Sequence, residues 1–477
     1  MSNNGTERWM QVTFFLYLIG LKYNESNRLL ELNDSERQEK YRKLLRWRLI
    51  LKRYVKRCIN MSDKKFAGVG AFEGNPKWEQ LIKRKKELYK RPHDTRSEFN
   101  RDYNRILHSN SFRRLKHKTQ VFFATQNDHI CTRIEHVNHV ASVSYTIADC
   151  LGLNTELTNA IAIGHDIGHA PFGHAGEEIL RKIITDEKTG SMFWHERNSL
   201  HFVDDIETIP DDEGKESNLD LTYAVRDGII CHCGEVDEEA LKPRQAAIDL
   251  CTIEQPSQYK PYTWEGCVVK VADKISYLGR DIEDAETLGI LSDKEINKLK
   301  KIIKNTVNVE VNQINNGELM HGFIIDLCRT SSPDTGIRFS PQYYELLQKI
   351  RKFNGDYIYR HPRLETYKKY AELVLTSIFQ VLKEMYAEEN TLDKINNYEH
   401  IYPTLVRVFR EWVLKYFDVR EDESVRKDYN NIIERFSNNV IYSIKSKNDY
   451  NKGLIDFISG FTDSFAIRVF NEIITFS

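Results

Sequence analysis

Residues 162–178 read AIGHDIGHAPFGHAGEE and place three histidines and three carboxylates within roughly five helical turns. Imidazole and carboxylate groups are the usual nitrogen and oxygen ligands of a divalent metal ion. The apolar run 157–163 predicts a helix that holds His165 and Asp166 firmly enough for both side chains to reach one ion. We therefore expect a metal site at the end of this helix.

The second half of the stretch predicts a break and a new helix. Pro171 and Gly173 should interrupt the helix. His174 and Glu177 are three residues apart, so they share one face of the segment that follows. An imidazole beside a carboxylate, close to a metal, indicates a catalytic centre.

The composition is that of a globular protein with two or three domains. The chain has 477 residues, of which 40% are hydrophobic, so it can bury a substantial core. Its 69 Lys and Arg residues nearly match its 70 Asp and Glu residues, which argues against a nucleic-acid coat over the whole surface. A polyanion would need a local basic pocket, and a small phosphorylated ligand fits that better than a long duplex.

The eight cysteines follow no disulfide framework, which favours reduced thiols and a cytoplasmic protein. Only Cys231 and Cys233, on either side of His232, lie close together. We expect two buried thiols flanking a histidine rather than a structural zinc site, because no second pair completes a tetrahedral ligand set.

Residues 1–60 are predicted to be a basic N-terminal extension. The apolar run 9–21 is shorter than the ~20 residues that span a bilayer, so we expect no membrane span and no export. Residues 42–57 form the most basic stretch, either a solvated helix docked on the body or a surface for a membrane or single-stranded nucleic acid. The composition changes at Met61. Two interpretations stay open: residues 1–60 are an appendage, or they lie upstream of the true start of the protein.

Two segments before the HD dipeptide predict further parts of a site. Residues 105–118 contain several basic side chains without matching acids. Polyphosphate binding requires such a local positive charge, but a solvated basic face of a helix has the same pattern. Residues 132–151 predict a long helix that ends at Gly152. His136 or His139 on that helix can face the next one and supply a third ligand.

Residues 268–285 predict a helix with a polar stripe. Asp273, Tyr277 and Asp281 repeat at i, i+4 and i+8, opposite an apolar face. If this polar stripe faces the protein interior, it implies a bound ligand. The alternative is a surface helix whose acidic side chains form salt bridges.

The remaining chain predicts helices that serve packing and an oligomer surface: 293–309, 343–353, 362–388, 405–416, 425–444 and 453–476. No Walker-type glycine loop occurs, so side chains and metal would have to hold nucleotide phosphates.

The order of the candidate ligands resembles a known superfamily. His136, then His165-Asp166, then Asp273 is similar to the H…HD…D set of the HD-domain metal phosphohydrolases. Four ordered blocks, 101–122, 132–136, 165–177 and 272–285, resemble signature blocks of the deoxyguanosinetriphosphate triphosphohydrolase (dGTPase) family. The resemblance covers about residues 90–290, with a weaker match at 359–362.

The resemblance implies an all-α enzyme with an HD-domain catalytic core in residues 61–290 and an additional C-terminal helical region in residues 291–477. Such an enzyme cleaves a deoxynucleoside triphosphate between the sugar oxygen and the α-phosphorus, and releases deoxynucleoside and inorganic triphosphate. The resemblance also implies a divalent metal ion, which is Mn, Mg or Fe. It further implies a homo-oligomer, either a tetramer or a hexamer. The implied metal ligands are His136, His165, Asp166 and Asp273.

The remaining site roles also come from the resemblance. His174, oriented by Glu177, would donate a proton to the leaving 5′ oxygen, and His195 matches another active-site histidine. Tyr277 would exclude a ribose 2′-hydroxyl and Asp281 would accept from the 3′-OH. The residues implied in binding phosphate are Arg133, Lys274 and Lys118, and those implied in reading the sugar are Gln120, Tyr277 and Asp281.

Three rival functions remain at this point. His165 and His169 imitate the i, i+4 pair of a zinc protease, but Asp166 stands where a glutamate is expected. An HD phosphodiesterase or nucleotidase acting on another nucleotide is the main enzymatic alternative. A nucleic-acid-binding regulatory module built on residues 42–57 is the non-enzymatic one. Base preference and nucleotide activation stay open.

Overall fold

The structure is a computed structural model that describes residues 64–88, 93–123, 127–190, 192–232, 239–309, 314 and 316–475. The chain divides into two compact units, Met1–Asp63 and Lys64–Ser477, and the described residues all belong to the second. The predicted extension 1–60, with its apolar run and basic helix, lies outside the described residues, as does Cys233. The boundary between residues 290 and 291 stays a prediction.

The described chain is all-α, as predicted. Its helices are α4 (Trp78–Leu81), α5 (Glu98–His108), α6 (Asn110–Arg114), α7 (Arg133–Leu151), α8 (Thr155–Gly164), α9 (Gly173–Asp186), α10 (His195–His201), α11 (Tyr223–Cys231), α12 (Trp264–Thr287), α13 (Asp293–Val307), α14 (Asn316–Thr330), α15 (Pro341–Asn354), α16 (Pro362–Glu384), α17 (Thr391–Asn397), α18 (Pro403–Tyr416), α19 (Glu423–Ile433), α20 (Lys447–Ser459) and α21 (Asp463–Ile474). No helix in these ranges is long and apolar enough to cross a membrane.

The strands in the described residues are short. β1 (Thr208–Pro210) pairs antiparallel with β2 (Glu216–Asn218), with Thr208 opposite Asn218. β3 (Ala240–Leu241) pairs antiparallel with β4 (Ile337–Arg338). Neither pair contributes a residue to the cavity described below.

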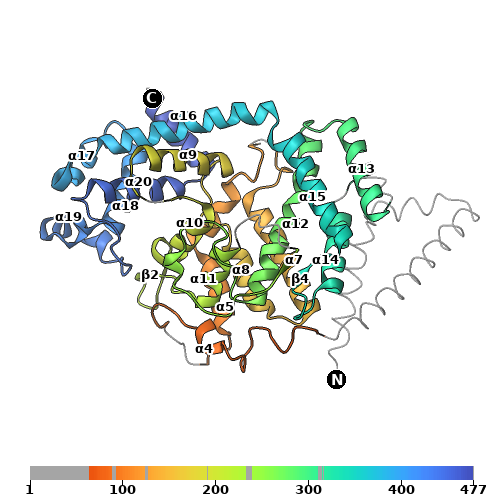
Figure 1. The fold of residues 1–477 in the computed structure, drawn as a ribbon. Helices are drawn as coiled ribbons and strands as arrows, with labels where there is room; N and C mark the ends of the chain where they lie inside the picture. The colour runs from red at the N-terminus through yellow and green to blue at the C-terminus, as the bar shows by residue number, and fades with distance from the viewer. Residues whose placement is uncertain are drawn as a thin grey trace, which may run out of the picture. The chain divides into compact units, whose positions relative to one another are not determined.

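The core that positions the site is a bundle of α5, α7, α8, α11 and α12, in which α8 contacts the other four (Figure 1). α7 begins with a capping box between Thr132 and Glu135 and ends at Gly152, whose φ of 81° gives the left-handed C-cap that the glycine predicted. α8 buries Leu157, Ile161 and most of its other residues, because neighbouring helices cover it all round.

The new helix begins at Gly173 as predicted, but α8 ends earlier than expected, so His165 and Asp166 follow the helix and do not belong to it. α8 ends at Gly164, and α9 begins where Phe172 and Gly173 have φ angles of 64° and 62°. A Cβ on Gly176 would lie 1.8 Å from the carbonyl oxygen of Pro171, and one on Gly168 would lie 2.1 Å from the backbone nitrogen of Ser199. The loop therefore folds tightly between α9 and α10.

The C-terminal helices reach back to this loop. α16 contacts α9, α20 and α21 (Figure 1). Asp463, at the start of α21, accepts hydrogen bonds from the backbone N–H groups of Thr119 and Phe172, both at 2.8 Å. The last helices of the chain thus hold the segment that carries the HD residues.

Two predicted C-terminal helices differ from the structure. The expected helix 453–476 is two helices, because Gly460 ends α20 and Thr462 caps α21 by accepting from the N–H of Phe465 at 3.1 Å. The expected helix 425–444 ends at Ile433. Beyond it the chain extends beside Tyr416, to whose carbonyl oxygen Ile441 donates its backbone N–H at 2.8 Å.

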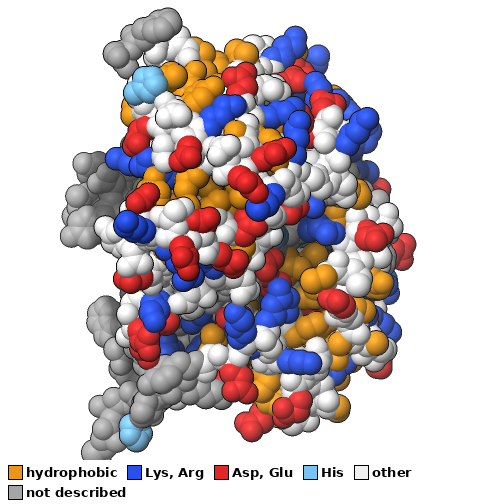
Figure 2. Space-filling model, turned by 90° about the vertical axis from the view of Figure 1, so that its left-hand side faces the viewer, with side chains coloured by type: hydrophobic (Ala, Val, Ile, Leu, Met, Phe, Trp, Pro, Cys, Tyr) orange, Lys and Arg blue, Asp and Glu red, His pale blue; other side chains and the backbone are white. Residues whose placement is uncertain are grey.

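The surface carries mixed charge. On the face drawn in Figure 2, Lys and Arg side chains are interspersed with Asp and Glu side chains. This mixture agrees with the near-zero net charge of the sequence.

Candidate active site

Most of the predicted site residues line one cavity of about 450 Å³. Residues from α7, α9, α10, α12 and α16 line it together with the loop that carries the HD dipeptide. The lining residues that the sequence predicted are Gln120, Arg133, His136, Asp166, His174, His195, Asp273, Lys274, Tyr277 and Asp281.

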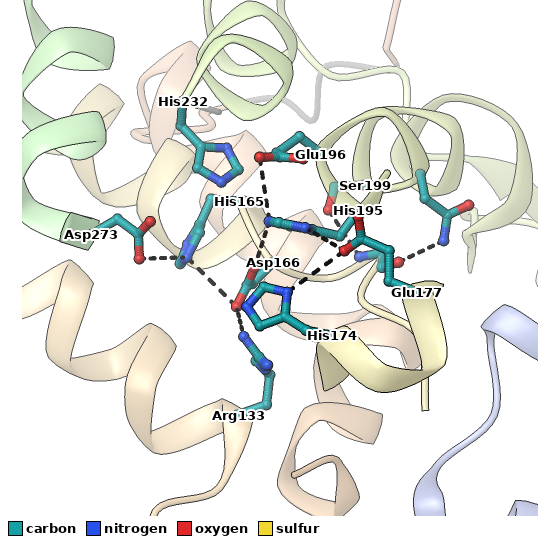
Figure 3. Close-up of polar contacts among 12 residues, drawn as sticks. Arg133, His165, Asp166, His174, Glu177, His195, Glu196, Ser199, His232 and Asp273 are labelled. Atoms are coloured by element: carbon teal, nitrogen blue, oxygen red, sulfur yellow. Dashed lines mark hydrogen bonds and ion pairs between the residues drawn. The ribbon is translucent and has the colours of Figure 1, made fainter. Parts of the chain in front are cut away.

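The four predicted metal ligands lie at one end of the cavity, with His165 behind its wall. His136 Nε2 lies 3.0 Å from Asp273 Oδ1 and 4.0 Å from Asp166 Oδ2. His165 Nε2 lies 3.7 Å from Asp273 Oδ1 and 3.8 Å from Asp166 Oδ2 (Figure 3). His165 points this nitrogen inward because its Nδ1 is 2.6 Å from the carbonyl oxygen of Ala162.

This donor set fits a divalent ion. An ion with ligands at about 2.1 Å in octahedral geometry separates neighbouring ligands by about 3 Å and opposite ones by about 4 Å. His136, His165 and Asp273 offer ligand atoms within 4.8 Å of one another, and Asp166 belongs to a second such group with His165 and His232. The buried Nε2 of His165 has no hydrogen-bond partner, and a metal would satisfy it. Two imidazoles and two carboxylates suit Mn, Fe or Mg better than a thiolate-rich set would.

Positive neighbours keep both acids ionised. Burial would raise the pKa of Asp166, but Arg133, whose Nη1 is 2.7 Å from Asp166 Oδ2, and the surrounding histidines hold it well below its usual range. Burial likewise opposes ionisation of Asp273, and the hydrogen bond to His136 with the charge of His165 lowers its pKa far below normal. Both carboxylates can therefore act as anionic ligands near neutral pH.

The proposed acid and its partner lie beside these ligands. The side chain of His174 is 73% exposed, and its Nδ1 lies 3.8 Å from Glu177 Oε2. Glu177 Oε2 is closer to His195, whose Nδ1 lies 2.9 Å away, and Glu177 Oε1 accepts from Arg181 at 2.7 Å. Burial would raise the pKa of Glu177, yet His174 and His195 keep it well below its usual range.

His195 is surrounded by carboxylates. Its Nε2 lies 3.4 Å from Glu196 Oε1 and 3.8 Å from Asp166 Oδ1 (Figure 3). Burial alone would lower the pKa of this imidazole, but Glu196, Glu177 and Asp166 together raise it to about 10. His195 therefore connects the His174 side of the cavity with the metal ligands.

The predicted polar stripe on α12 faces the cavity. Asp273, Tyr277 and Asp281 all line it, whereas Ile275 and Ile282 are buried in the core. Asp281 Oδ2 accepts from the hydroxyl of Tyr359 at 2.6 Å, and its buried Oδ1 has no partner. Burial raises the pKa of Asp281 to about 7.

Four residues outside this stripe were also predicted to bind phosphate or sugar, and three of them line the cavity. Arg133, Gln120 and Lys274 line it, and the buried Oε1 of Gln120 has no hydrogen-bond partner. Lys118 does not line it. Its buried ammonium donates to the carbonyl oxygens of His169 and Ser459, and burial lowers its pKa to about 7.

Sequence reasoning missed several residues that line the cavity: His169, Glu196, His232, Tyr359, Leu364, Tyr367 and Lys368. His232 was interpreted only as part of a cysteine-flanked triplet, but it ends α11 with its ring 4.9 Å from that of His165. Tyr367 and Lys368 come from α16, about two hundred residues after the HD dipeptide, and only the weak match at 359–362 pointed toward that helix.

Comparison with known proteins identifies the family. A model of the HD domain matches residues 133–278, which run from the start of α7 into α12 and contain all four candidate ligands. A deoxyguanosinetriphosphate triphosphohydrolase-like protein of Caldanaerobacter subterraneus subsp. tengcongensis is 34% identical over 287 residues, which cover 60% of this chain and 72% of that protein. The chain belongs to the deoxyguanosinetriphosphate triphosphohydrolase-like family.

Further members of the dGTPase-like family agree with this. The protein of that name from Desulfatibacillum aliphaticivorans is 35% identical over 291 residues, covering 60% of this chain and 74% of its own length. The one from Clostridium tetani is 29% identical over 393 residues, which cover 80% of this chain and 86% of that protein. Family membership and the His/Asp cluster together give the class, a metal-dependent phosphohydrolase.

Proposed function

We propose that this dGTPase-like protein hydrolyses deoxynucleoside triphosphates to deoxynucleoside and inorganic triphosphate. The names of its relatives support the substrate class. The observation that carries the proposal is that one cavity joins a divalent-metal donor set to a tyrosine and a carboxylate suited to a deoxyribose. A volume of about 450 Å³ is in the range of cavities that bind small molecules.

His136, His165, Asp166 and Asp273 would hold the ion, which is Mn, Mg or Fe in this proposal. When bound, it supplies Lewis acidity toward a phosphate oxygen and lowers the pKa of a water molecule. Arg133 orients Asp166 through the hydrogen bond at 2.7 Å, and Ala162 fixes the ring of His165. α7, α12 and the loop after α8 would therefore present the four ligands before any substrate arrives.

His174 is the proposed proton donor to the departing 5′ oxygen, which is a poor leaving group without a proton. Its exposed ring borders the cavity, and its Nδ1 lies 3.8 Å from Glu177 Oε2. His195, the other residue assigned to catalysis, holds Glu177 in place through its hydrogen bond at 2.9 Å. A shift of His174 toward Glu177 on substrate binding would complete the pair, since such hydrogen bonds are often long in free enzymes.

The sugar is proposed to lie along α12. Tyr277, one turn from Asp273, would occupy the space beside C2′ and exclude a ribose hydroxyl. The unpartnered Oδ1 of Asp281 would accept from the 3′-OH while Tyr359 holds its other oxygen. Gln120 is assigned to the sugar as well.

Basic side chains would bind the phosphates. Lys274 and Arg133 line the cavity, and Lys368 of α16 adds a cation there that the sequence did not suggest. Lys118 would act indirectly, because its ammonium holds the backbone of His169 and Ser459. A homo-oligomer of four or six chains in the cytoplasm, a possible single-stranded nucleic-acid partner and the base preference all stay predictions.

The alternative is an HD phosphodiesterase or nucleotidase acting on another nucleotide. The test is to incubate the metal-loaded protein with each of the four deoxynucleoside triphosphates, singly and mixed, and to separate the products. Matched incubations use deoxynucleoside monophosphates and a phosphodiester such as bis(p-nitrophenyl) phosphate, and an Asp166→Asn variant is the control. Deoxynucleoside plus triphosphate supports the proposal, whereas turnover of the phosphodiester or monophosphate alone supports the alternative.

A further inference from the structure

Two cysteines that the proposed function does not use lie together at the ends of α7 and α14. Cys150 is the last residue but one of α7 and is partly exposed, whereas Cys328, near the end of α14, is 3% exposed. The two helices pack side by side (Figure 1). The thiol of Cys328 donates a hydrogen bond to the sulfur of Cys150, and both cysteines are reduced. One sulfur is therefore open to solvent while its neighbour is buried.

Hydrogen bonds from one dipeptide hold the two helix ends against each other. The backbone N–H of Phe66 donates to the carbonyl oxygen of Leu151 at 2.9 Å. The ammonium of Lys65 donates to the carbonyl oxygen of Arg329 at 3.1 Å. These two acceptors directly follow the two cysteines in the chain. The neighbouring backbone therefore supports the pairing of the thiols, which does not depend on the side chains alone.

Cys150 is the more accessible thiol and is also activated. The hydrogen bond from Cys328, with the charge of Lys65, lowers the pKa of Cys150 to about 7, although burial opposes this change. The thiolate is the form of cysteine that attacks oxidants, so Cys150 can react near neutral pH. Cys251 is more exposed, yet partial burial and Asp249 raise its pKa. Cys251 therefore offers a comparison thiol without this activation.

We propose that Cys150 and Cys328 form a reversible oxidation site, which hydrogen peroxide converts to a disulfide. The Cys150 thiolate attacks one peroxide oxygen, the O–O bond breaks, and a sulfenic acid and hydroxide form. The sulfur of Cys328 then attacks the sulfur of Cys150, the S–O bond breaks, and the oxygen leaves as water with the Cys328 proton. The two sulfurs lose two electrons in total, and the peroxide gains them. This site lies outside the cavity and does not depend on the proposed function.

A disulfide here would tie α7 to α14 without reaching the cavity. Cys150 is roughly four helical turns from His136 on α7, so the candidate ligands stay in place. The bond would close a long loop between the two helix ends, and such closure stabilises the folded chain by restricting the unfolded one. It would also spare Cys150 from irreversible oxidation to sulfinic acid. The alternative is a packing pair that does not react.

The test uses the full chain, reduced first and then exposed to hydrogen peroxide. Remaining thiols are alkylated, the protein is digested without reductant, and mass spectrometry maps the linked peptides. Thermal unfolding is followed on the same samples, with and without dithiothreitol. The variants are Cys328→Ser, which keeps a hydroxyl donor beside Cys150, and Cys251→Ser, which removes an exposed thiol elsewhere and serves as the matched control.

We expect a peptide that links Cys150 to Cys328 in the wild type and in Cys251→Ser, and its loss on reduction. Oxidation should raise their unfolding midpoint by about 2–5 °C, as a cross-link of typical strength does in a chain of this size. Cys328→Ser should give no linked peptide, no rise in the midpoint, and sulfinic acid on Cys150. Peroxide that leaves the pair reduced, links Cys150 to another cysteine or oxidises Cys251 first overturns the proposal. Should Cys328→Ser not fold, the peptide map of the wild type still decides.

Discussion

His174 and Glu177 show how two residues three positions apart are placed in different environments. Both lie in the first turn and a half of α9, yet the His174 side chain is 73% exposed and that of Glu177 is 8% exposed. The buried carboxylate of Glu177 can orient the accessible imidazole of His174 toward a substrate. The proton donor can then reach a leaving group in the cavity.

The His174→Ala variant should lower kcat by about 10²–10⁴-fold, since general acid catalysis contributes that much. KM and bound metal should stay close to wild type, because the candidate ligands are untouched. Steady-state kinetics with a deoxynucleoside triphosphate, together with metal analysis, measure this. His400→Ala, which removes an exposed histidine remote from the cavity, serves as the control. A loss confined to KM would show that His174 binds substrate and is not the acid.

Tyr277 is predicted to select the sugar. Removing its ring in Tyr277→Ala should open the space beside C2′ and raise the ratio of kcat/KM for GTP over dGTP, even if the overall rate falls. Tyr277→Phe keeps the ring and should leave the ratio unchanged. Equal ratios in all three proteins would mean that Tyr277 is a packing residue.

The sequence predicted those site residues that are adjacent in the chain or that recur with the period of an α-helix. His165 and Asp166 are adjacent, and Asp273, Tyr277 and Asp281 follow the helical repeat, so their common face was foreseeable. His232 and Lys368 reach the cavity through the packing of α11 and α16, which local sequence does not encode. Lys118 follows the basic pattern, but tertiary packing turns it toward the backbone.

A partly buried histidine, His201, joins α10 to α20. His201 Nδ1 lies 3.0 Å from Asp205 Oδ2, and its Nε2 lies 3.1 Å from Asp456 Oδ2, which also accepts from the hydroxyl of Tyr442. Burial alone would lower the pKa of His201, but Asp456 and Asp205 raise it from about 6.5 to about 10. α10 also carries His195, so this link supports the position of the active site.

The raised pKa predicts a pH-dependent contribution to stability. A group that binds its proton more tightly when folded stabilises the folded state fully below pH 6.5, and this contribution is lost as pH rises toward about 10. The contribution should be roughly 1–3 kcal/mol, because the pair is partly exposed and screened. Urea unfolding of wild type and His201→Asn at pH 6, 8 and 10 measures it. A difference between the two proteins that does not shrink with rising pH contradicts the ion pair.

Long periodic helices were predicted well, and helix ends less well. The expected helix 132–151 matches α7 because a capping box and a C-terminal glycine mark its ends. α4 (Trp78–Leu81) is short, and Arg84 beyond it leaves the helix to pair with Glu98 and Asp102. A tertiary ion pair of this kind is not visible in local propensity.

At the scale of the whole molecule, the C-terminal region is part of the active-site framework. Asp463 is 3% exposed and accepts hydrogen bonds from the backbone N–H groups of Thr119 and Phe172. Lys118 makes a second link of the same kind between His169 and Ser459. Residues more than three hundred positions apart therefore fix the loop that carries the HD dipeptide.

The Asp463→Ala variant should lose about 1–3 kcal/mol of unfolding free energy for each buried amide left without an acceptor. It should also weaken metal binding, because the loop that follows Asp166 loses its anchor. Thermal unfolding and a Mn²⁺ titration measure both effects, and Asp428→Ala, an exposed aspartate on α19, is the control. Unchanged metal affinity alongside reduced stability would show that the anchor serves folding alone.

The proposed reaction is attack of water on the α-phosphorus, after which the deoxynucleoside leaves. The most direct measurement is hydrolysis of a deoxynucleoside triphosphate in ¹⁸O-labelled water, with mass spectrometry of the products. We predict one ¹⁸O atom in inorganic triphosphate, none in the deoxynucleoside, and no labelled product from Asp166→Asn. Label in orthophosphate or pyrophosphate, with a nucleoside di- or monophosphate as the other product, would contradict the account.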